Sequence, residues 1–389
     1  MKIITPHNKC TGCHACFSAC PTNAISICRD YAGFLYPTIN QELCVDCNLC
    51  VRICPINKIA RSDTNNSALP KAFACINADG LIRYESSSGG AFTAFAEEIL
   101  SNGGVVFGAR FDPEFNVVHD YTETIEGLSK FRGSKYVESS IGLTLKIAKQ
   151  FLQEGRLVLF SGTPCQIEGL LSFLGKEYQN LITIDLICHG VPSPMIWAKY
   201  IRYRNKQYKS TPERVSFRDK RLGWKLYSLS IEYQNMRKYS KSLNDDLYMQ
   251  LFLNNVCLRE SCYKCKFKVL HRKSDITIAD FWGIERKNPE LFDNRGTSLL
   301  LIHSSKGYEL TKLISNKVHL VDMDLGEAIS NNMNAIKSAQ KPIGRIWLPR
   351  YISYHNFTLV GIMLRNFKLA KRFKSKAIDI FQRLMKANN

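Results

Sequence analysis

The chain has 389 residues, of which 45% are hydrophobic and 22% are charged, a composition that excludes wholesale disorder and fibrous architectures. Its length exceeds what a single hydrophobic core supports, so we expect several domains. Lys and Arg outnumber Asp and Glu by 19, and the excess is concentrated in residues 199–241 and 341–389. No apolar run is long enough to span a bilayer and no secretory signal is recognisable, so we expect a cytoplasmic protein.

The 15 cysteines are the second unusual feature of the composition. A reducing cytoplasm keeps thiols reduced, so metal or cluster binding explains them better than a disulfide framework. Eight of them form two CxxCxxCxxxCP runs that repeat after 34 residues. This is the spacing of bacterial two-cluster ferredoxins, in which the fourth cysteine of each run binds the other run's 4Fe-4S cluster. The predicted ligand sets are Cys10, Cys13, Cys16 and Cys54 for one cluster, and Cys44, Cys47, Cys50 and Cys20 for the other.

A pair of zinc sites is the alternative for these runs. Zinc prefers two separated pairs of ligands, and it would leave the third cysteine of each CxxCxxC and both prolines unexplained. We therefore expect an α+β ferredoxin-like module with two 4Fe-4S clusters over residues 1–60. Within it, residues 24–39 predict a hairpin that covers the clusters, and Cys28 is interpreted as a small buried hydrophobic residue. The polar segment 61–70 is the predicted linker.

Alternating apolar runs and helical stretches then predict an α/β core. An SSSGG segment at 86–90 precedes a helix expected over 91–101. Backbone N–H groups at such a helix start suit a phosphate, although simple N-capping explains the serines equally well. Residues 105–111 and 117–121 predict a strand pair. The RGSKY loop at 132–136 suits an anionic cofactor or is a solvated turn.

Two further strands are predicted at 156–161 and 181–187, with a helix between them at 167–174. A strand-helix-strand crossover of this length makes the strands parallel, so both exit loops open on the same edge of the sheet. Ligands in open α/β sheets bind at that edge. Cys165 and Cys188 lie in these two loops, and we therefore expect them to face one crevice.

A CxxC pair downstream, Cys262 and Cys265, could complete a site with these two cysteines. From spacing alone the site could hold a third 4Fe-4S cluster or a zinc ion, or its thiols could be unligated. Cys75 and Cys257 have no partners at motif spacing and are interpreted as core residues. His189 is a candidate proton donor or flavin contact.

Several of these motifs, in this order, resemble the coenzyme F420 hydrogenase/dehydrogenase beta-subunit family. They are SSSGGAF at 86–92, RGSKY at 132–136, GTPCQ at 162–166, CHG at 188–190 and SCYKC at 261–265. The resemblance covers residues 71–320 and implies an α/β flavoprotein core with FAD and a 4Fe-4S cluster. It implies cluster ligands at Cys165, Cys188, Cys262 and Cys265. It implies FAD-binding loops at Ser88, Gly89 and Gly90, and at Gly133, Ser134, Lys135 and Tyr136.

The function that follows is an iron-sulfur flavoprotein oxidoreductase, which passes electrons between a hydride carrier, deazaflavin-like or other, and the clusters. Lys135 is expected to stabilise the reduced flavin or the pyrophosphate, and His189 is the second candidate catalytic residue. One alternative is a non-catalytic electron-transfer subunit that serves a separate redox enzyme. A zinc-dependent adaptor is another.

The two basic segments suggest partners. The patch at 199–241 would attract an acidic hydride carrier or redox protein, or it is a solvated surface. A helical basic region is expected over 321–389, and an amphipathic helix within it would lie on the inner face of an anionic membrane or dock onto the core or a partner. Nucleic-acid binding is not expected, because no recognition motif is present.

Overall fold

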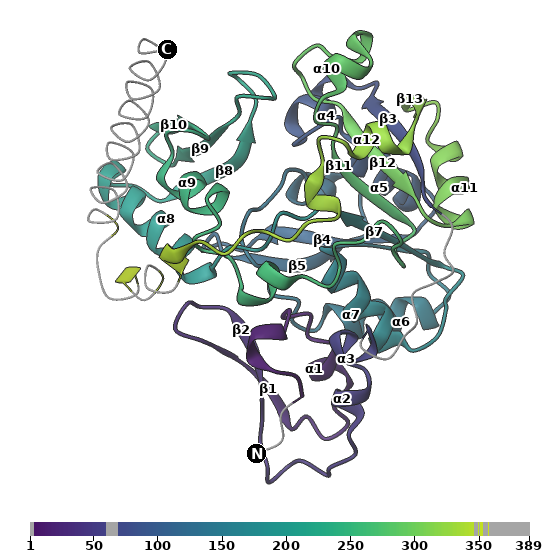
Figure 1. The fold of residues 1–389 in the computed structure, drawn as a ribbon, viewed down its shortest axis with the longest axis vertical. Helices are drawn as coiled ribbons and strands as arrows, with labels where there is room; N and C mark the ends of the chain where they lie inside the picture. Colours follow the sequence, from purple (N-terminus) through teal and green to yellow (C-terminus); the bar gives the residue numbers. More distant parts are fainter. Residues whose placement is uncertain (1–3, 60–68, 346–348, 350, 353–356, 358–389) are drawn as a thin grey trace, which may run out of the picture.

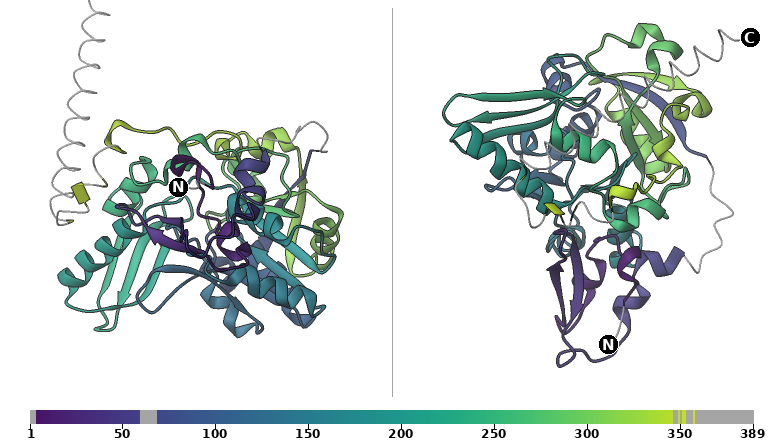
Figure 2. Two further views of the ribbon diagram at one scale, coloured as in Figure 1. Left: turned by 90° about the horizontal axis from the view of Figure 1, so that it is seen from below. Right: turned by 60° about the vertical axis from the view of Figure 1, so that its left-hand side comes forward.

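The computed structural model describes residues 4–59, 69–345, 349, 351–352 and 357. Most of the predicted linker and the whole predicted amphipathic helix lie outside the described residues. Figure 1 shows a small N-terminal module, drawn in purple, against one end of a larger core. In the right-hand view of Figure 2 the same module projects from the core. Within the described residues, no helix combines the length and apolarity needed to cross a membrane.

The N-terminal module is built from short elements around a hairpin. Strand β1 pairs antiparallel with β2, with Ile25 opposite Ile39, so the predicted hairpin is confirmed. Cys28 on β1 is exposed, so its interpretation as a buried residue was wrong: it lies on the solvent side of a two-stranded sheet that buries only one face. The elements are η1 (His7–Lys9), α1 (Ala15–Ala19), β1 (Ile25–Arg29), β2 (Leu35–Ile39), α2 (Leu49–Arg52) and α3 (Pro55–Ile59).

An eight-stranded mixed sheet forms the core, in the order β13-β3-β12-β11-β7-β6-β4-β5. Strands β4, β6, β7 and β11 are parallel, and antiparallel strands flank them on both sides. The predicted parallel pair is confirmed as β6 and β7. The strands are β3 (Lys71–Asn77), β4 (Val105–Phe111), β5 (Val117–Thr122), β6 (Val158–Ser161), β7 (Leu181–Leu186), β11 (Ile276–Asp280), β12 (Ser298–Ile302) and β13 (Val318–Met323).

Helices cover both faces of the parallel strands, which explains their continuous apolar runs. Leu159 of β6 packs into the cluster beneath α5 and α11. Its neighbour Phe160 packs on the opposite face beneath α6 and α7. The helices of the core are α4 (Gly80–Glu85), α5 (Ala91–Ser101), α6 (Thr144–Gln153), α7 (Pro164–Leu174), α10 (Ile284–Lys287), α11 (Ser305–Leu313) and α12 (Leu325–Ile329), with the short 3-10 helices η2 (Glu126–Lys130) and η4 (Pro289–Leu291).

The core continues past the predicted boundary at residue 320. That boundary falls inside β13, which pairs with β3. Beyond it, Asn332 donates a hydrogen bond to the Asp280 carbonyl, and Arg345 donates one to the Leu258 carbonyl. The chain up to Arg345 therefore packs on the core, including η5 (Met333–Ala335) and η6 (Ile343–Arg345).

A second lobe contains the basic segment at 199–241. A three-stranded antiparallel sheet, β10-β9-β8, packs with helices α8 and α9 around a core that contains Trp197, Tyr200 and Tyr248. No pattern in the sequence predicted this sheet. The elements are α8 (Pro194–Tyr208), β8 (Pro212–Asp219), β9 (Ser228–Tyr233), β10 (Lys238–Ser242), α9 (Leu247–Leu253) and η3 (Glu260–Lys264).

Much of the positive charge of this lobe is neutralised. Six of its cations form ion pairs with carboxylates: Arg204, Arg214, Arg218, Arg221, Lys225 and Lys238. Four of the acidic partners come from outside the segment, so a count of charges along the segment overestimates its field. The steering charge expected from the sequence is reduced accordingly.

Candidate functional site

The cysteines of the first predicted cluster line one cavity in the N-terminal module. Cys10, Cys13 and Cys16 come from the loop around the start of α1, and Cys54 directly precedes α3. The structure thus brings the fourth cysteine of the second run to the first three of the first run, as the ferredoxin spacing predicts. Burial raises the pKa of Cys13 to about 12, so binding of iron there must displace a proton.

The cysteines of the second predicted cluster line another cavity, made of Cys20, Cys44, Cys47 and Cys50. This second cavity is closer to solvent, since Cys47 is exposed whereas Cys13 is buried. The Ala24 N–H donates a hydrogen bond to the Cys20 sulfur at 3.2 Å. Amide donors of this kind stabilise negatively charged sulfur ligands.

The first cavity contains buried polar atoms that a cluster would satisfy. Both ring nitrogens of His14 are buried, and neither has a hydrogen-bond partner among the described residues. His14 lies between Cys13 and Cys16 and lines the cavity, and burial lowers its pKa to about 4. Buried unpaired donors are costly, and the sulfur atoms of a bound cluster would accept a hydrogen bond from this ring. The residues present therefore fit a 4Fe-4S cluster.

The core cysteines converge from three segments. Cys165 lies in the first turn of α7, Cys188 follows β7, Cys262 lies in η3 and Cys265 follows it. Burial raises the pKa of Cys165, and the neighbouring Cys265, Cys188 and Cys262 raise it further. The Val191 N–H approaches the Cys262 sulfur at 3.5 Å. The exits of the parallel strands β6 and β7 bring Cys165 near Cys188. The segment around η3 adds Cys262 and Cys265, which lie up to 100 positions from Cys165 in the sequence.

Neither the N-terminal cysteines nor the core cysteines are arranged as closed sites for a single metal ion. Among the described residues, no set of three or more His, Cys, Asp or Glu side chains is placed to hold one metal ion. A tetrahedral zinc site would bring its sulfur atoms to about 3.8 Å from one another. In a four-iron cube each thiolate binds a different iron atom, which keeps the sulfur atoms further apart.

Helix α7 connects the core cysteines to the first cavity. Cys165 lies in the first turn of the helix, and one turn later Gly169 packs on Cys13: a Cβ at Gly169 would lie 2.6 Å from the Cys13 Cβ. The Ser172 hydroxyl donates a hydrogen bond to the Ile53 carbonyl at 2.5 Å. Cys165 and Gly169 are about 6 Å apart along the helix axis. The core cysteines and the first cavity are therefore neighbours.

A cavity of about 420 Å³ lies beside Cys188 and at the ends of the parallel strands. Its volume falls in the range of cofactor and ligand sites. Most residues predicted from the two FAD-binding loops line it, together with the predicted catalytic residues: Ser88, Gly90, Gly133, Ser134, Lys135, Tyr136 and His189. Aromatic walls come from Tyr136, Phe252 and Trp282.

The two predicted flavin loops contact each other directly. The Ser134 N–H donates a hydrogen bond to the Ser87 hydroxyl at 2.6 Å. The residue that caps α5 is Gly90, in a left-handed conformation and without a side-chain cap, whereas the Ser88 hydroxyl donates to the Thr297 carbonyl. The N-capping explanation of the serines is therefore wrong, and the hydroxyl groups instead fix the loop that lines the cavity.

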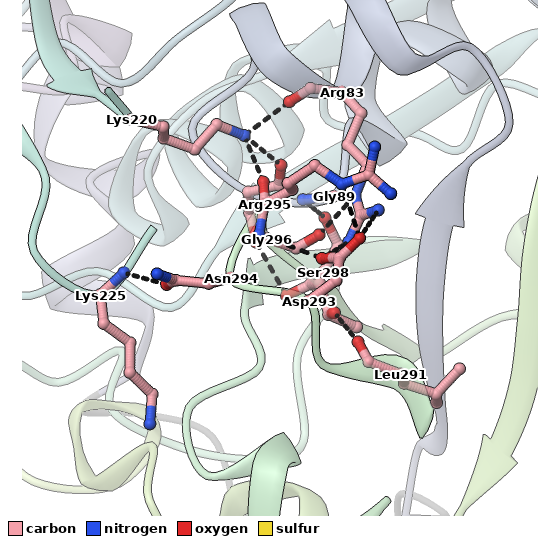
Figure 3. A network of polar contacts seen from close by, with 12 residues as sticks. Arg83, Gly89, Lys220, Lys225, Leu291, Asp293, Asn294, Arg295, Gly296 and Ser298 are labelled. Carbon is pink, nitrogen blue, oxygen red and sulfur yellow. Dashed lines mark hydrogen bonds and ion pairs between the residues drawn. The ribbon is translucent and has the colours of Figure 1, made fainter. Parts of the chain in front are cut away.

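Gly89 lies behind the cavity wall rather than in it. A Cβ at Gly89 would lie 2.3 Å from the Cys75 carbonyl oxygen, so only glycine fits between the loop and β3. Its N–H donates a hydrogen bond to the Ser298 hydroxyl at 2.9 Å. Figure 3 shows Lys220 pointing its amine at backbone carbonyls nearby, with hydrogen bonds to Arg83, Ser88 and Arg295. These contacts hold the loop in place.

The charged groups of the cavity wall are held by the protein. The Lys135 amine donates hydrogen bonds to the Lys130 and Arg132 carbonyls at 2.9 Å each, and burial lowers its pKa to about 7. His189 donates from Nε2 to Asn255 at 2.6 Å and accepts at Nδ1 from Asn334 at 3.3 Å. Because both of its nitrogens are engaged, the geometry favours a ring contact over a free proton donor for His189.

Sequence reasoning missed two residues of this wall. The Arg218 guanidinium is buried, donates two hydrogen bonds to Asp280 at 2.8 and 2.9 Å, and keeps its Nε without a partner among the described residues. His119 is buried between Ser139 and the Ser161 carbonyl. Neither residue belongs to a motif, so no sequence signal could have found them.

Two family models match parts of the chain. Residues 155–324 match the family model for the C-terminal part of the beta subunit of coenzyme F420 hydrogenase/dehydrogenase. Residues 155–324 thus belong to this beta-subunit family. Residues 9–58 match the 4Fe-4S dicluster domain, so the beta-subunit fold is joined here to an iron-sulfur module.

No curated protein matches the chain. Among solved structures, a chain of the xenon-derivatized F420-reducing NiFe hydrogenase complex from Methanosarcina barkeri is similar, with 14% sequence identity over 72% of this chain and 99% of that chain, at a TM-score of 0.47.

Proposed function

We propose that this beta-subunit family member is an iron-sulfur flavoprotein oxidoreductase, which exchanges electrons between a hydride carrier and three 4Fe-4S clusters through FAD. The observation that supports it is the contiguity of the sites. Cys188 lines the 420 Å³ cavity, and α7 joins the core cysteines to the first N-terminal cavity through Gly169. A hydride carrier releases two electrons together and a cluster accepts one, and a flavin, when bound, supplies the conversion between the two.

Different residues of the chain would then bind the flavin and the clusters. The glycine loop at 86–90 and Arg218 would hold the polar parts of the cofactor, and Tyr136 and Trp282 would exclude water from its ring. Lys135, as an ammonium group, would stabilise negative charge on the cofactor. The eight N-terminal cysteines would hold two clusters, and Cys165, Cys188, Cys262 and Cys265 would hold the third.

A redox protein and the hydride carrier would meet the chain at different places. Cys47 of the second cavity is exposed, which suits electron exchange with a redox protein at that end. The hydride carrier would reach the cofactor through the same 420 Å³ cavity, which Phe252 and Leu253 of the second lobe help to line. A cytoplasmic location and a membrane-bound tail remain predictions from the sequence.

The test is anaerobic purification followed by quantitation of iron, acid-labile sulfide and flavin. We expect about twelve irons per chain and one flavin, and reduction of the bound flavin by a hydride donor followed by bleaching of the cluster absorbance. Clusters without flavin would instead support an electron-transfer subunit. Protein without iron or labile sulfide after reconstitution would refute the proposal.

A further inference from the structure

A buried ion pair joins the N-terminal module to the core. Arg259 is fully buried, and its guanidinium forms an ion pair with Glu138, whose side chain is 4% exposed. The same guanidinium donates hydrogen bonds to the Cys10 carbonyl and to the Leu35 carbonyl, each at 2.8 Å. The Leu35 N–H in turn donates to Glu138 at 3.2 Å. One ion pair therefore contacts both the cysteine loop and the hairpin of the module.

Arg259 also contacts a predicted cluster ligand directly. Its Nη2 lies 3.7 Å from the Cys10 sulfur, in hydrogen-bond geometry. The guanidinium carbon lies 4.0 Å above the centre of the Tyr36 ring, which excludes water from the other side. Three residues further along, Cys262 belongs to the core cysteines. Arg259 thus lies between the first cavity and the core site.

The loop of the first run is shaped around this pair. Gly12 has a φ of +72°, and a Cβ there would lie 2.8 Å from a Glu138 carboxylate oxygen and 2.9 Å from Nη1 of Arg259. Any side chain at this position would push the ion pair away from Cys10. At the second cavity, by contrast, the Cys20 sulfur is contacted by the uncharged Ala24 amide and Thr22 hydroxyl.

We propose that Arg259 is a positioning residue that raises the reduction potential of the cluster bound by Cys10, Cys13, Cys16 and Cys54. The inference rests on the proposed function. When one electron arrives from the reduced cofactor in the core, this site gains one unit of negative charge, and a cation that donates a hydrogen bond to its ligand stabilises the reduced state. Glu138 offsets part of that effect. The first site thereby becomes the preferred acceptor of electrons from the core.

Substitutions of the two partners of the ion pair should shift the reduction potential of the first cluster in opposite directions. Glu138→Gln leaves Arg259 uncompensated, so the potential of the first cluster should rise. The double variant Arg259→Met with Glu138→Gln removes the cation without leaving a buried carboxylate, so the potential should fall. We expect each change to alter the one-electron equilibrium of this cluster by tenfold or more, which corresponds to about 59 mV. The potential of the second cluster should stay constant in both variants.

The measurement is an EPR-monitored redox titration of the anaerobic holoprotein, with the second cluster's signal assigned through Cys47→Ser. Iron content and circular dichroism verify that each variant is folded and loaded. The control is Arg110→Met with Asp120→Asn, a pair joined at 2.6 Å on the β4–β5 hairpin, which should leave both potentials unchanged. A potential of the first cluster that does not move, or that moves in the same direction in both variants, would overturn the inference alone. Absence of the cluster signals from the wild-type holoprotein would overturn the proposed function and the inference with it.

Discussion

The contact between α7 and the first cavity predicts an unusual effect of a mild substitution, Gly169→Ala. In a solvent-exposed helix interior this change would stabilise the protein by about 1 kcal/mol. Here the new Cβ would lie 2.6 Å from the Cys13 Cβ and 3.0 Å from its sulfur, whereas carbon atoms in contact keep about 3.5–4.0 Å. The module must therefore withdraw by about 1 Å, and overpacking of this kind costs about 1–3 kcal/mol.

The expected net effect of Gly169→Ala is destabilisation by up to about 2 kcal/mol, together with slower electron transfer from the core to the N-terminal clusters. Denaturant unfolding followed by cluster absorbance gives the first quantity, and stopped-flow reduction by a hydride donor gives the second. Gly80→Ala is the matched control, because Gly80 begins α4 and a Cβ added there would meet no described atom within 4 Å. A Gly169→Ala protein whose free energy of unfolding rises by about 1 kcal/mol, and which transfers electrons at the wild-type rate, would refute the packing argument.

Three further outcomes are expected. Cys262→Ser should lower the iron content from about twelve to about eight per chain, whereas Cys257→Ser should leave it unchanged; equal losses would contradict the assignment. Flavin affinity should weaken as the pH rises above about 7, the pKa of Lys135, by up to tenfold per pH unit. The reason is that above this pKa an anionic ligand binds only after the Lys135 amine takes up a proton. In Lys135→Met, titration calorimetry should show no dependence of the affinity on pH in this range. Gly89→Ala should lower the affinity for flavin while the clusters stay bound, since its Cβ would lie 2.3 Å from the Cys75 carbonyl oxygen and displace the loop. A fluorescence titration that finds wild-type affinity would exclude this loop from the flavin site.

Some of the helices and strands around the site could be predicted, because neighbouring residues in the sequence determine them. Hydrophobic runs and the turn residues between them located α5 and the parallel pair β6 and β7, and the crossover rule then placed Cys165 near Cys188. The three-stranded sheet of the second lobe was not predicted, because the excess of Lys and Arg in residues 199–241 was interpreted as a surface patch and the apolar runs of its strands are short. Their ion pairs with Asp280, Glu285 and Glu85 form only when distant segments pack together.

The grouping of the eight N-terminal cysteines follows from the amino-acid sequence, because the ligand spacing of a ferredoxin is carried by a few neighbouring residues. The joining of that module to the core arises only when the chain is folded. Arg259 and Cys10 are 249 positions apart, and Gly169 meets Cys13 from a different domain. Such contacts depend on the shape and charge of surfaces that exist only after both parts have folded, and no spacing rule records them.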